Sequence, residues 1–379
     1  MVRGPSTVLP GSSINNRYDG RQACIIRPFF QWLDMSDKLQ ESAFLKACRG
    51  EPADYTPIWL NRQAGRYMKE YHEVKGSTPS LDFFKTPHLA AQVTCDAQRI
   101  LGVDAAIMFA DLLPILEPMG LELDYLPGIG PNIANPVRTG ADIDHLRVDP
   151  AVETMPYIGE VIQLIRAELP GDIPLIGFGG APFTLASYAV EGQGSRNYIE
   201  VKRLMLSDRG AFKALMDKMT STAIDYLSYQ IDEGVQAVQI FDSWVGALSV
   251  HDYREHVFAH SQRLIEAISG RVPVIHFGTG NPSLLPLMAE AGGDVIALDW
   301  RAPLKESWEL MGVKAVQGNL DPVALFADRE SVLQSAKVVL DDAGGRPGHI
   351  FNLGHGILPE TPVDNVKALV DFVHESTQG

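Results

Sequence analysis

Two arginines four positions apart, Arg62 and Arg66, stand out in this chain as a possible anion-binding pair. On a helix, residues four apart share a face, so both guanidinium groups would point the same way. Two planar guanidinium groups on one face can bind carboxylates or phosphates with paired hydrogen bonds. An ordinary solvated pair that forms surface ion pairs is the equally weighted alternative. Gly65 between them lowers helix stability by about 1 kcal/mol and suits a place where a ligand approaches the backbone.

Other polar residues stand at or soon after the ends of apolar runs. Asp111 lies inside such a run, and a carboxylate buried there needs a partner because its desolvation is costly. It would either cap the next helix or hold a fixed negative charge, and its position favours the second role. His355 lies between two glycines, Tyr188 offers a phenol, and Ser243 lacks the context of a nucleophile and is interpreted as a hydrogen-bond donor. His276, inside a run, is interpreted as a core residue.

Eight short apolar runs, separated by segments of helical periodicity, place these residues in a fold. They span residues 57–60, 104–109, 174–179, 237–242, 273–278, 294–299, 314–319 and 349–354. Continuously apolar runs are typical of parallel strands buried on both faces. Eight strand–helix repeats predict an α/β fold, a single (β/α)8 TIM-type barrel, with an open doubly wound sheet as the competitor. The barrel is favoured because no run is followed by the Gly-x-Gly-x-x-Gly signature of a dinucleotide-binding helix.

The residues just after each predicted strand would form the active site, because barrel enzymes place theirs at the carboxyl ends of the strands. In chain order they are Asn61-Arg62-Gln63, Asp111, Gly180-Ala181-Pro182-Phe183, Ser243-Trp244, Thr279-Gly280-Asn281, Trp300-Arg301, Leu320-Asp321 and His355-Gly356. Polar, chargeable and glycine residues accumulate there, which a purely structural barrel would not need. The sequence therefore predicts an enzyme whose mouth carries Arg, Asp, Tyr, Ser and His side chains and binds an anion.

Composition excludes several classes of protein. The chain has 379 residues, is 45% hydrophobic and carries 32 Lys and Arg against 47 Asp and Glu, a formal net charge of -15. This acidic balance argues against nucleic acid or an anionic membrane as a partner. No stretch reaches the roughly 18 apolar residues of a membrane span. The three cysteines are too few for a disulfide framework, which predicts a cytoplasmic protein, and no motif predicts a metal or another cofactor.

The first 34 residues differ from the rest, and we expect the barrel to span residues 35–379. Residues 1–34 contain scattered Arg, Ser, Gly and Pro without a hydrophobic pattern. A true start at Met35, with the upstream residues an artefact or disordered, is one interpretation of them. A targeting segment is the other, because transit peptides are rich in Arg and Ser.

Five segments of the chain resemble the uroporphyrinogen decarboxylase family. Residues 57–67 are similar to its first signature and residues 179–188 to its second. Residues 109–111, 241–244 and 352–356 fall in the family's order and spacing, and the resemblance covers residues 38–375. Two departures, Asn61 where Met is commoner and Ala110 where Ser is commoner, remove no chargeable group.

The resemblance implies a cofactor-independent lyase of haem and chlorophyll biosynthesis that forms a homodimer with its mouths facing. It would convert the four acetate arms of uroporphyrinogen III to methyl groups, giving coproporphyrinogen III and CO2. Asp111 would hold the pyrrole NH groups and stabilise the cation that forms, while Arg62 would donate a proton or anchor a carboxylate. The resemblance assigns substrate binding to Arg62, Gln63, Ala64, Gly65, Arg66, Asp111, Tyr188, Ser243 and His355.

Two alternatives stand beside this family. A corrinoid-linked methyltransferase on the same barrel would need a zinc-bound thiolate near the later strands, and the chain has no cysteine after Cys95. A non-catalytic tetrapyrrole carrier would need the arm-binding residues but not Asp111. A turnover assay separates the carrier from an enzyme.

Residues 1–34 are expected to contribute nothing to stability or turnover, because a segment without a hydrophobic pattern adds no core. A chain that begins at Met35 should match the full chain in thermal melting and in turnover of uroporphyrinogen. A melting temperature lowered by several degrees would show that the segment packs on the barrel.

Overall fold

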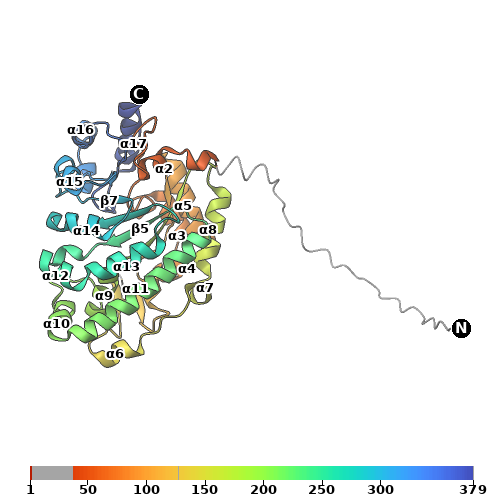
Figure 1. Ribbon diagram of the computed structural model, residues 1–379. Helices are drawn as coiled ribbons and strands as arrows, with labels where there is room; N and C mark the ends of the chain where they lie inside the picture. Colours follow the sequence, from red (N-terminus) through yellow and green to blue (C-terminus); the bar gives the residue numbers. More distant parts are fainter. Residues whose placement is uncertain (2–36, 127, 379) are drawn as a thin grey trace.

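A parallel sheet forms the centre of the molecule, with helices around it (Figure 1). It has seven strands, in the order β1-β4-β5-β6-β7-β8-β9. The computed structural model describes Met1 and residues 37–126 and 128–378, so the rest of the predicted extension and its boundary at residue 35 lie outside the described residues. The strands are β1 (Ala106–Ile107), β4 (Leu175–Gly180), β5 (Ala237–Asp242), β6 (Val274–Gly278), β7 (Val295–Ala297), β8 (Ala315–Gln317) and β9 (His349–Ile350). A separate antiparallel hairpin, β2 (Leu123–Leu126) and β3 (Gly130–Ile133), lies between β1 and β4 in the chain.

At least one helix follows each strand of the parallel sheet (Figure 1). The first half of the chain contains α2 (Ala43–Cys48), α3 (Lys69–Lys75), α4 (Ser80–Lys85), α5 (Pro87–Leu101), α6 (Gly140–His145), α7 (Ala151–Thr154), α8 (Tyr157–Glu168) and α9 (Pro182–Glu191). The second half contains α10 (Ile199–Ser207), α11 (Arg209–Asp232), α12 (Val250–His256), α13 (Phe258–Ile268), α14 (Leu285–Ala291), α15 (Leu304–Met311), α16 (Arg329–Ala343) and α17 (Val363–Thr377). Short 3-10 turns include η1 (Pro114–Leu116) and η4 (Pro322–Phe326).

The predicted first strand, residues 57–60, joins the two edges of this sheet. On the β9 side, the Phe351 N–H donates to the Pro57 carbonyl at 2.8 Å, and on the β1 side the Asp104 N–H donates to the Ile58 carbonyl at 2.9 Å. Ile58 forms only a single parallel bridge, to Phe351. Its own N–H donates to the Asp104 carboxylate at 2.7 Å instead of to a strand carbonyl, so the ladder stops there. The predicted (β/α)8 arrangement is confirmed, with an eighth segment that pairs through isolated contacts.

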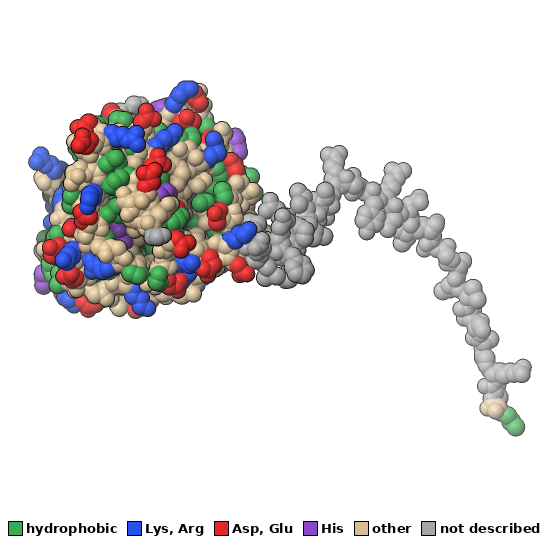
Figure 2. All heavy atoms as spheres, turned by 90° about the horizontal axis from the view of Figure 1, so that it is seen from above, with side chains coloured by type: hydrophobic (Ala, Val, Ile, Leu, Met, Phe, Trp, Pro, Cys, Tyr) green, Lys and Arg blue, Asp and Glu red, His purple; other side chains and the backbone are tan. Residues whose placement is uncertain are grey.

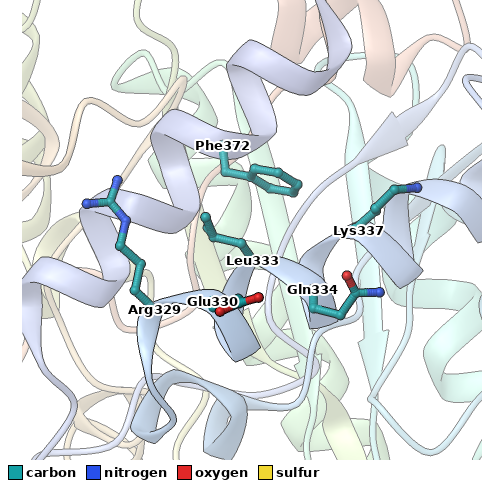
Figure 3. A pocket seen from close by; sticks show the side chains of 6 residues that line it. All are labelled: Arg329, Glu330, Leu333, Gln334, Lys337 and Phe372. Atoms are coloured by element: carbon teal, nitrogen blue, oxygen red, sulfur yellow. The ribbon is translucent and has the colours of Figure 1, made fainter.

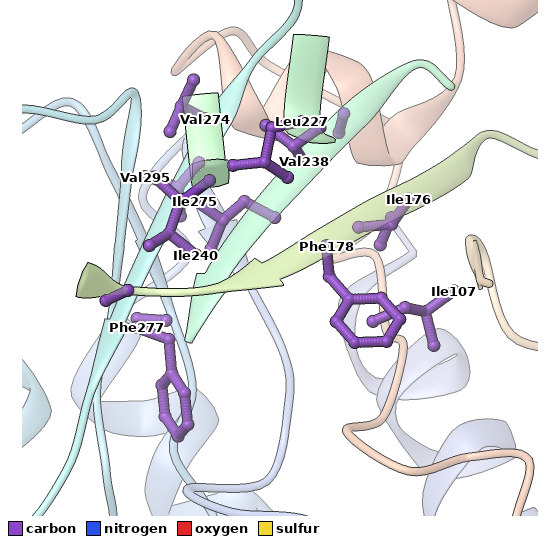
Figure 4. Packing of buried hydrophobic residues seen from close by; sticks show 14 of the residues in the cluster. Ile107, Ile176, Phe178, Leu227, Val238, Ile240, Val274, Ile275, Phe277 and Val295 are labelled. Atoms are coloured by element: carbon purple, nitrogen blue, oxygen red, sulfur yellow. The ribbon is translucent and has the colours of Figure 1, made fainter. Parts of the chain in front are cut away.

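The two faces of the sheet pack against different partners. Val238 and Ile240 of β5 belong to the same buried cluster as Leu227 of α11 (Figure 4). Because side chains alternate along a strand, Phe241 points to the opposite face. There its ring lies 5.7 Å from the ring of Phe178 in β4 and 5.7 Å from that of Phe277 in β6. This row of aromatic rings lies next to the carboxyl ends of three neighbouring strands.

A chain of buried amides crosses the inside of the barrel. The Trp59 indole N–H donates to Gln317 Oε1 at 2.9 Å, and Gln317 Nε2 donates to Gln239 Oε1 at 2.9 Å. Gln239 Nε2 then donates to Asn61 Oδ1 at 3.0 Å, and Asn61 Nδ2 to the Leu353 carbonyl at 3.4 Å. Buried polar groups are costly unless they are paired, so these bonds hold the closing segment to β5, β8 and the residues after β9.

The surface carries both signs of charge, and in Figure 2 acidic and basic side chains are interspersed over the face in view. Within the described part of the chain, no helix combines the length and the apolar character needed to cross a bilayer.

A buried carboxylate connects the closing segment to the last helix. Asp104 is 8% exposed and accepts hydrogen bonds from the Tyr55 hydroxyl at 2.8 Å, the Ile58 N–H at 2.7 Å and His374 Nε2 at 2.8 Å. Burial by itself lowers the pKa of His374, but the Asp104 carboxylate outweighs burial and the pKa is raised. The pair therefore favours the protonated imidazole.

This raised pKa predicts a pH-dependent contribution to stability. The contribution is fully present below the unfolded histidine pKa of about 6.5 and is lost as pH rises through the higher folded value. Replacing His374 by Gln should therefore lower the free energy of unfolding by about 1 kcal/mol at pH 5.5 and by less at pH 8.5. Urea unfolding of both proteins at the two pH values measures the difference. A loss of equal size at both would contradict the charged pair.

Candidate active site

Four of the residues singled out in the sequence act on one another at the carboxyl ends of the strands. Burial, helped by the Asp111 carboxylate and opposed by the Arg62 charge, raises the pKa of Tyr188 to about 12. Burial and, after it, the charge of Arg62 lower the pKa of His355 to about 4. Arg62 therefore lies close to Tyr188, after β4, and to His355, after β9, and Tyr188 in turn lies close to Asp111, after β1.

Arg62 is presented by a turn, and the helix considered for residues 62–66 is wrong. Residues 61–67 form turns and bends, and α3 begins only at Lys69. Arg62 has a φ of 62°, in the left-handed region of the backbone. Residues other than glycine rarely adopt this region, because it costs them roughly 1–3 kcal/mol. A Cβ at Gly65 would lie 2.9 Å from the Arg62 carbonyl oxygen, so the tight turn itself requires glycine there. Arg62 remains exposed at this turn.

The other predicted residues of this turn differ in exposure. Gln63 is buried, and both ends of its amide bond to the backbone: Oε1 accepts from the Leu60 N–H at 3.1 Å and Nε2 donates to the Ala105 carbonyl at 3.0 Å. These bonds fix the turn to the start of β1. Ala64 is also buried, whereas Arg66 is exposed. The side chain of Gln63 thus supports the turn that carries the arginines.

Asp111 is half-buried after β1 and is surrounded by phenols. Its Oδ1 accepts from the Leu113 N–H at 3.1 Å, just before η1, so it caps a turn as well as facing the mouth. Burial raises the pKa of Tyr125 and of Tyr226, and the Asp111 carboxylate adds to both shifts. The buried Tyr125 hydroxyl has no hydrogen-bond partner among the described residues. Nothing in the sequence pattern pointed to these two tyrosines, because tertiary packing brings the hairpin and α11 to this place.

The loop after β5 is tied to the first turn of α9. The Thr184 hydroxyl donates to Asp242 Oδ1 at 3.0 Å and accepts from the Trp244 N–H at 3.3 Å. The Trp244 ring lies 5.5 Å from that of Tyr188. Burial raises the pKa of Asp242 to about 7, opposed by the Thr184 hydroxyl. Ser243, half-buried between these residues, is therefore held by contacts that sequence reasoning had not identified.

His355 is a neutral hydrogen-bonding group held between two glycines. Its Nδ1 accepts from the Gly356 N–H at 2.7 Å, so the proton is on Nε2, which is left to donate. A Cβ at Gly356 would overlap the side chain of Arg62, and one at Gly354 would overlap the backbone nitrogen of Trp300. Glycines flank the histidine because neighbouring groups approach the backbone on both sides.

The structure also locates features that lie away from the mouth. A hollow between α16 and α17 is lined by Arg329, Glu330, Leu333, Gln334, Lys337 and Phe372, none of them a predicted site residue (Figure 3). His276 is fully buried, as expected of a core residue. Among residues 37–126 and 128–378, no group of three or more His, Cys, Asp and Glu side chains could hold a metal ion.

Comparison with known proteins identifies the family of this chain. Residues 39–376 match the family model of Uroporphyrinogen decarboxylase (URO-D). The Uroporphyrinogen decarboxylase of Carboxydothermus hydrogenoformans is 54% identical, with 88% of this chain and 95% of the relative covered. The Uroporphyrinogen decarboxylase of Sorangium cellulosum is 53% identical, with 87% and 95% covered.

A solved structure supports the fold independently. A methyltransferase from Methanosarcina mazei has a TM-score of 0.76 over 89% of this chain and 99% of its own, at 22% sequence identity. At such low sequence identity, the similarity supports the fold but not a shared chemistry. The family match spans nearly the whole described barrel, and two relatives exceed half identity over most of their length. This chain belongs to the uroporphyrinogen decarboxylase family.

Proposed function

We propose that the mouth of this barrel decarboxylates the four acetate arms of uroporphyrinogen III, giving coproporphyrinogen III and CO2. The family match assigns the chain uroporphyrinogen decarboxylase activity, a step of porphyrin biosynthesis. One observation carries the proposal: Tyr188 lies close to both Asp111 and Arg62, and the Arg62 side chain lies against the loop of His355, so the four groups line one mouth. Their chemistry fits a flat ring with acidic arms and N–H groups.

The reaction needs an electron sink, and the pyrrole ring supplies it. Protonation of a ring carbon makes the ring cationic, and the bond between the acetate methylene and its carboxylate then breaks. The electron pair of that bond moves into the ring, CO2 leaves, and the exocyclic methylene takes a proton to become methyl. The ring carbon returns its proton, so each arm consumes one proton overall. No metal or organic cofactor is required by this sequence of steps.

Asp111 stabilises the cationic ring. A preorganised charge aimed at the place where charge develops lowers the barrier, because it pays no reorganisation cost during the reaction. The carboxylate also accepts hydrogen bonds from the pyrrole N–H groups. Leu113 uses one of its roughly four lone-pair positions, which leaves the others for the ring. The row formed by Phe178, Phe241 and Phe277 offers the macrocycle an apolar surface.

The remaining residues bind the carboxylate arms. Arg62 is exposed on its turn and anchors a carboxylate, and arginine is a poor proton donor because its ordinary pKa is about 12.5–13.8. Neutral His355 donates from Nε2, and the protonated Tyr188 phenol donates beside Asp111. Arg66, Ser243 and the turn residues Gln63, Ala64 and Gly65 complete the binding surface, Gln63 by supporting the backbone.

A homodimer with facing mouths and a cytoplasmic location complete the proposal. Large apolar side chains are exposed at Ile129 on the hairpin tip and at Ile199 and Leu206 on α10, where a second copy could cover them. Cys48 and Cys95 are buried free thiols, which suits a reducing compartment.

Asp111→Asn is expected to lower kcat by about 10²–10³ with little change in thermal melting. A unit charge about 4 Å from the cation contributes up to about 4 kcal/mol at an effective dielectric of about 20, which agrees with that loss. Asn keeps the shape and one acceptor for the Leu113 N–H. Steady-state turnover of uroporphyrinogen and melting are measured on the same preparation.

Asp294→Asn is the control for this variant. Asp294 directly precedes β7, at the end of the sheet opposite the mouth, and its carboxylate accepts from the Val274 N–H at 2.8 Å, a bond to the backbone like that of Asp111. It should leave kcat unchanged. If Asp111→Asn kept kcat within about threefold of the parent, the charge would not be stabilising a transition state.

In sedimentation-equilibrium experiments, the protein should have about twice the mass of the 41.5 kDa chain at micromolar concentration. Ile199→Asp with Leu206→Asp should shift it toward the monomer, because two buried charges at an interface are costly. A parent protein that sediments as a monomer would rule out the dimer.

A further inference from the structure

A second arginine, Arg301, lies close to His355. Asp299, 3% exposed after β7, accepts from the Arg301 N–H at 2.9 Å and from Arg301 Nη1 at 2.8 Å. It also accepts from the Gly280 N–H at 2.6 Å, so its charge is shared among three donors. The Arg301 side chain is fixed at one nitrogen and remains 48% exposed.

Aromatic stacking holds this guanidinium in place. The Arg301 guanidinium carbon lies 3.9 Å from the centre of the Trp300 ring, and that ring lies 6.4 Å from the ring of His355. The charge of Arg301, like that of Arg62, lowers the pKa of His355 after burial has done so. The loop of His355 therefore lies between two arginines, with Gly356 against Arg62 and Gly354 against Trp300.

We infer that Arg301 binds a carboxylate arm of the tetrapyrrole, a role that the family resemblance does not assign to it. The inference rests on the proposed function, which supplies a ligand with eight carboxylates. A guanidinium has five N–H donors, and Asp299 occupies one of them, so donors remain for a carboxylate. The stack on Trp300 and the bond to Asp299 hold the group in place before the ligand arrives, which lowers the entropy lost on binding.

The competing interpretation is that Arg301 serves only as the partner of buried Asp299. In that case its removal would lower the melting temperature and leave substrate affinity unchanged. Binding of a carboxylate arm predicts the opposite, a raised KM with kcat nearly intact, because the contact is made equally in the ground state and the transition state.

The kinetic experiment compares Arg301→Gln with a matched variant elsewhere. Arg346 stacks on Trp308 at 4.3 Å, and its charge lowers the pKa of His349, so Arg346→Gln removes the same kind of stacked arginine far from the mouth. Arg301→Gln should raise KM for uroporphyrinogen about tenfold with kcat within about twofold, as loss of one charged hydrogen bond predicts. Arg346→Gln should leave both values unchanged. An unchanged KM in Arg301→Gln would overturn the inference, whatever its melting temperature.

A readout without turnover accompanies the kinetics. In ¹⁵N-histidine NMR titrations, Arg301→Gln should raise the pKa of His355, because a repelling charge is gone, and should leave His349 unmoved. Arg346→Gln should raise the pKa of His349 and leave that of His355 unchanged. Uroporphyrin, a stable octacarboxylate, should bind Arg301→Gln about tenfold more weakly than the parent. If the parent failed to decarboxylate uroporphyrinogen, the proposed function would fall, and equal uroporphyrin affinities of parent and variant would separately overturn the role of Arg301.

Discussion

The need of buried amides for partners determines how this barrel closes and where its mouth residues lie. Gln239 and Gln317 point inward from β5 and β8, where water cannot satisfy them, and each bonds to the other and to the closing segment. That segment pairs with the sheet through few backbone bonds, so the side-chain bonds of Trp59 and Asn61 hold its register. Without Asn61, the Gln239 amide would lose its acceptor.

The position of Asn61 directly fixes the turn that follows. The turn brings Arg62 close to Tyr188, after β4, and His355, after β9, because Arg62 adopts a left-handed φ. Gly65 permits this turn because it has no Cβ to collide with the Arg62 carbonyl oxygen. The cationic Arg62 then lies near His355 and Tyr188, and burial keeps both of those in their neutral, proton-bearing forms at neutral pH. Closure of the barrel therefore positions both the cationic guanidinium of Arg62 and the neutral hydrogen-bond donors His355 and Tyr188.

Periodicity predicted the barrel and located its mouth, because buried parallel strands leave a continuous apolar signal and their carboxyl ends are local in the sequence. It could not predict the turn at Arg62, where tertiary bonds override the helical spacing of the two arginines. Gln63 shows the same limit of sequence patterns. It belongs to a binding motif, but its side chain supports the backbone, and only its hydrogen bonds to Leu60 and Ala105 reveal that role. Tyr125 lies on a hairpin whose position depends on packing, so no spacing rule indicated it.

Charge composition is a weak guide to the substrate of such a protein. The net charge of -15 belongs mostly to exposed groups, and salt screens these beyond about 8 Å in physiological solution. Within the partly buried mouth, screening is weaker, so Arg62 and Arg301 act on His355 at short range against little opposition except Asp299. A substrate with eight carboxylates therefore meets the field of a few fixed guanidinium groups rather than that of the whole molecule. In the mechanism proposed here, the same reduction of screening lets the single carboxylate of Asp111 stabilise a ring cation in a mouth that otherwise attracts anions.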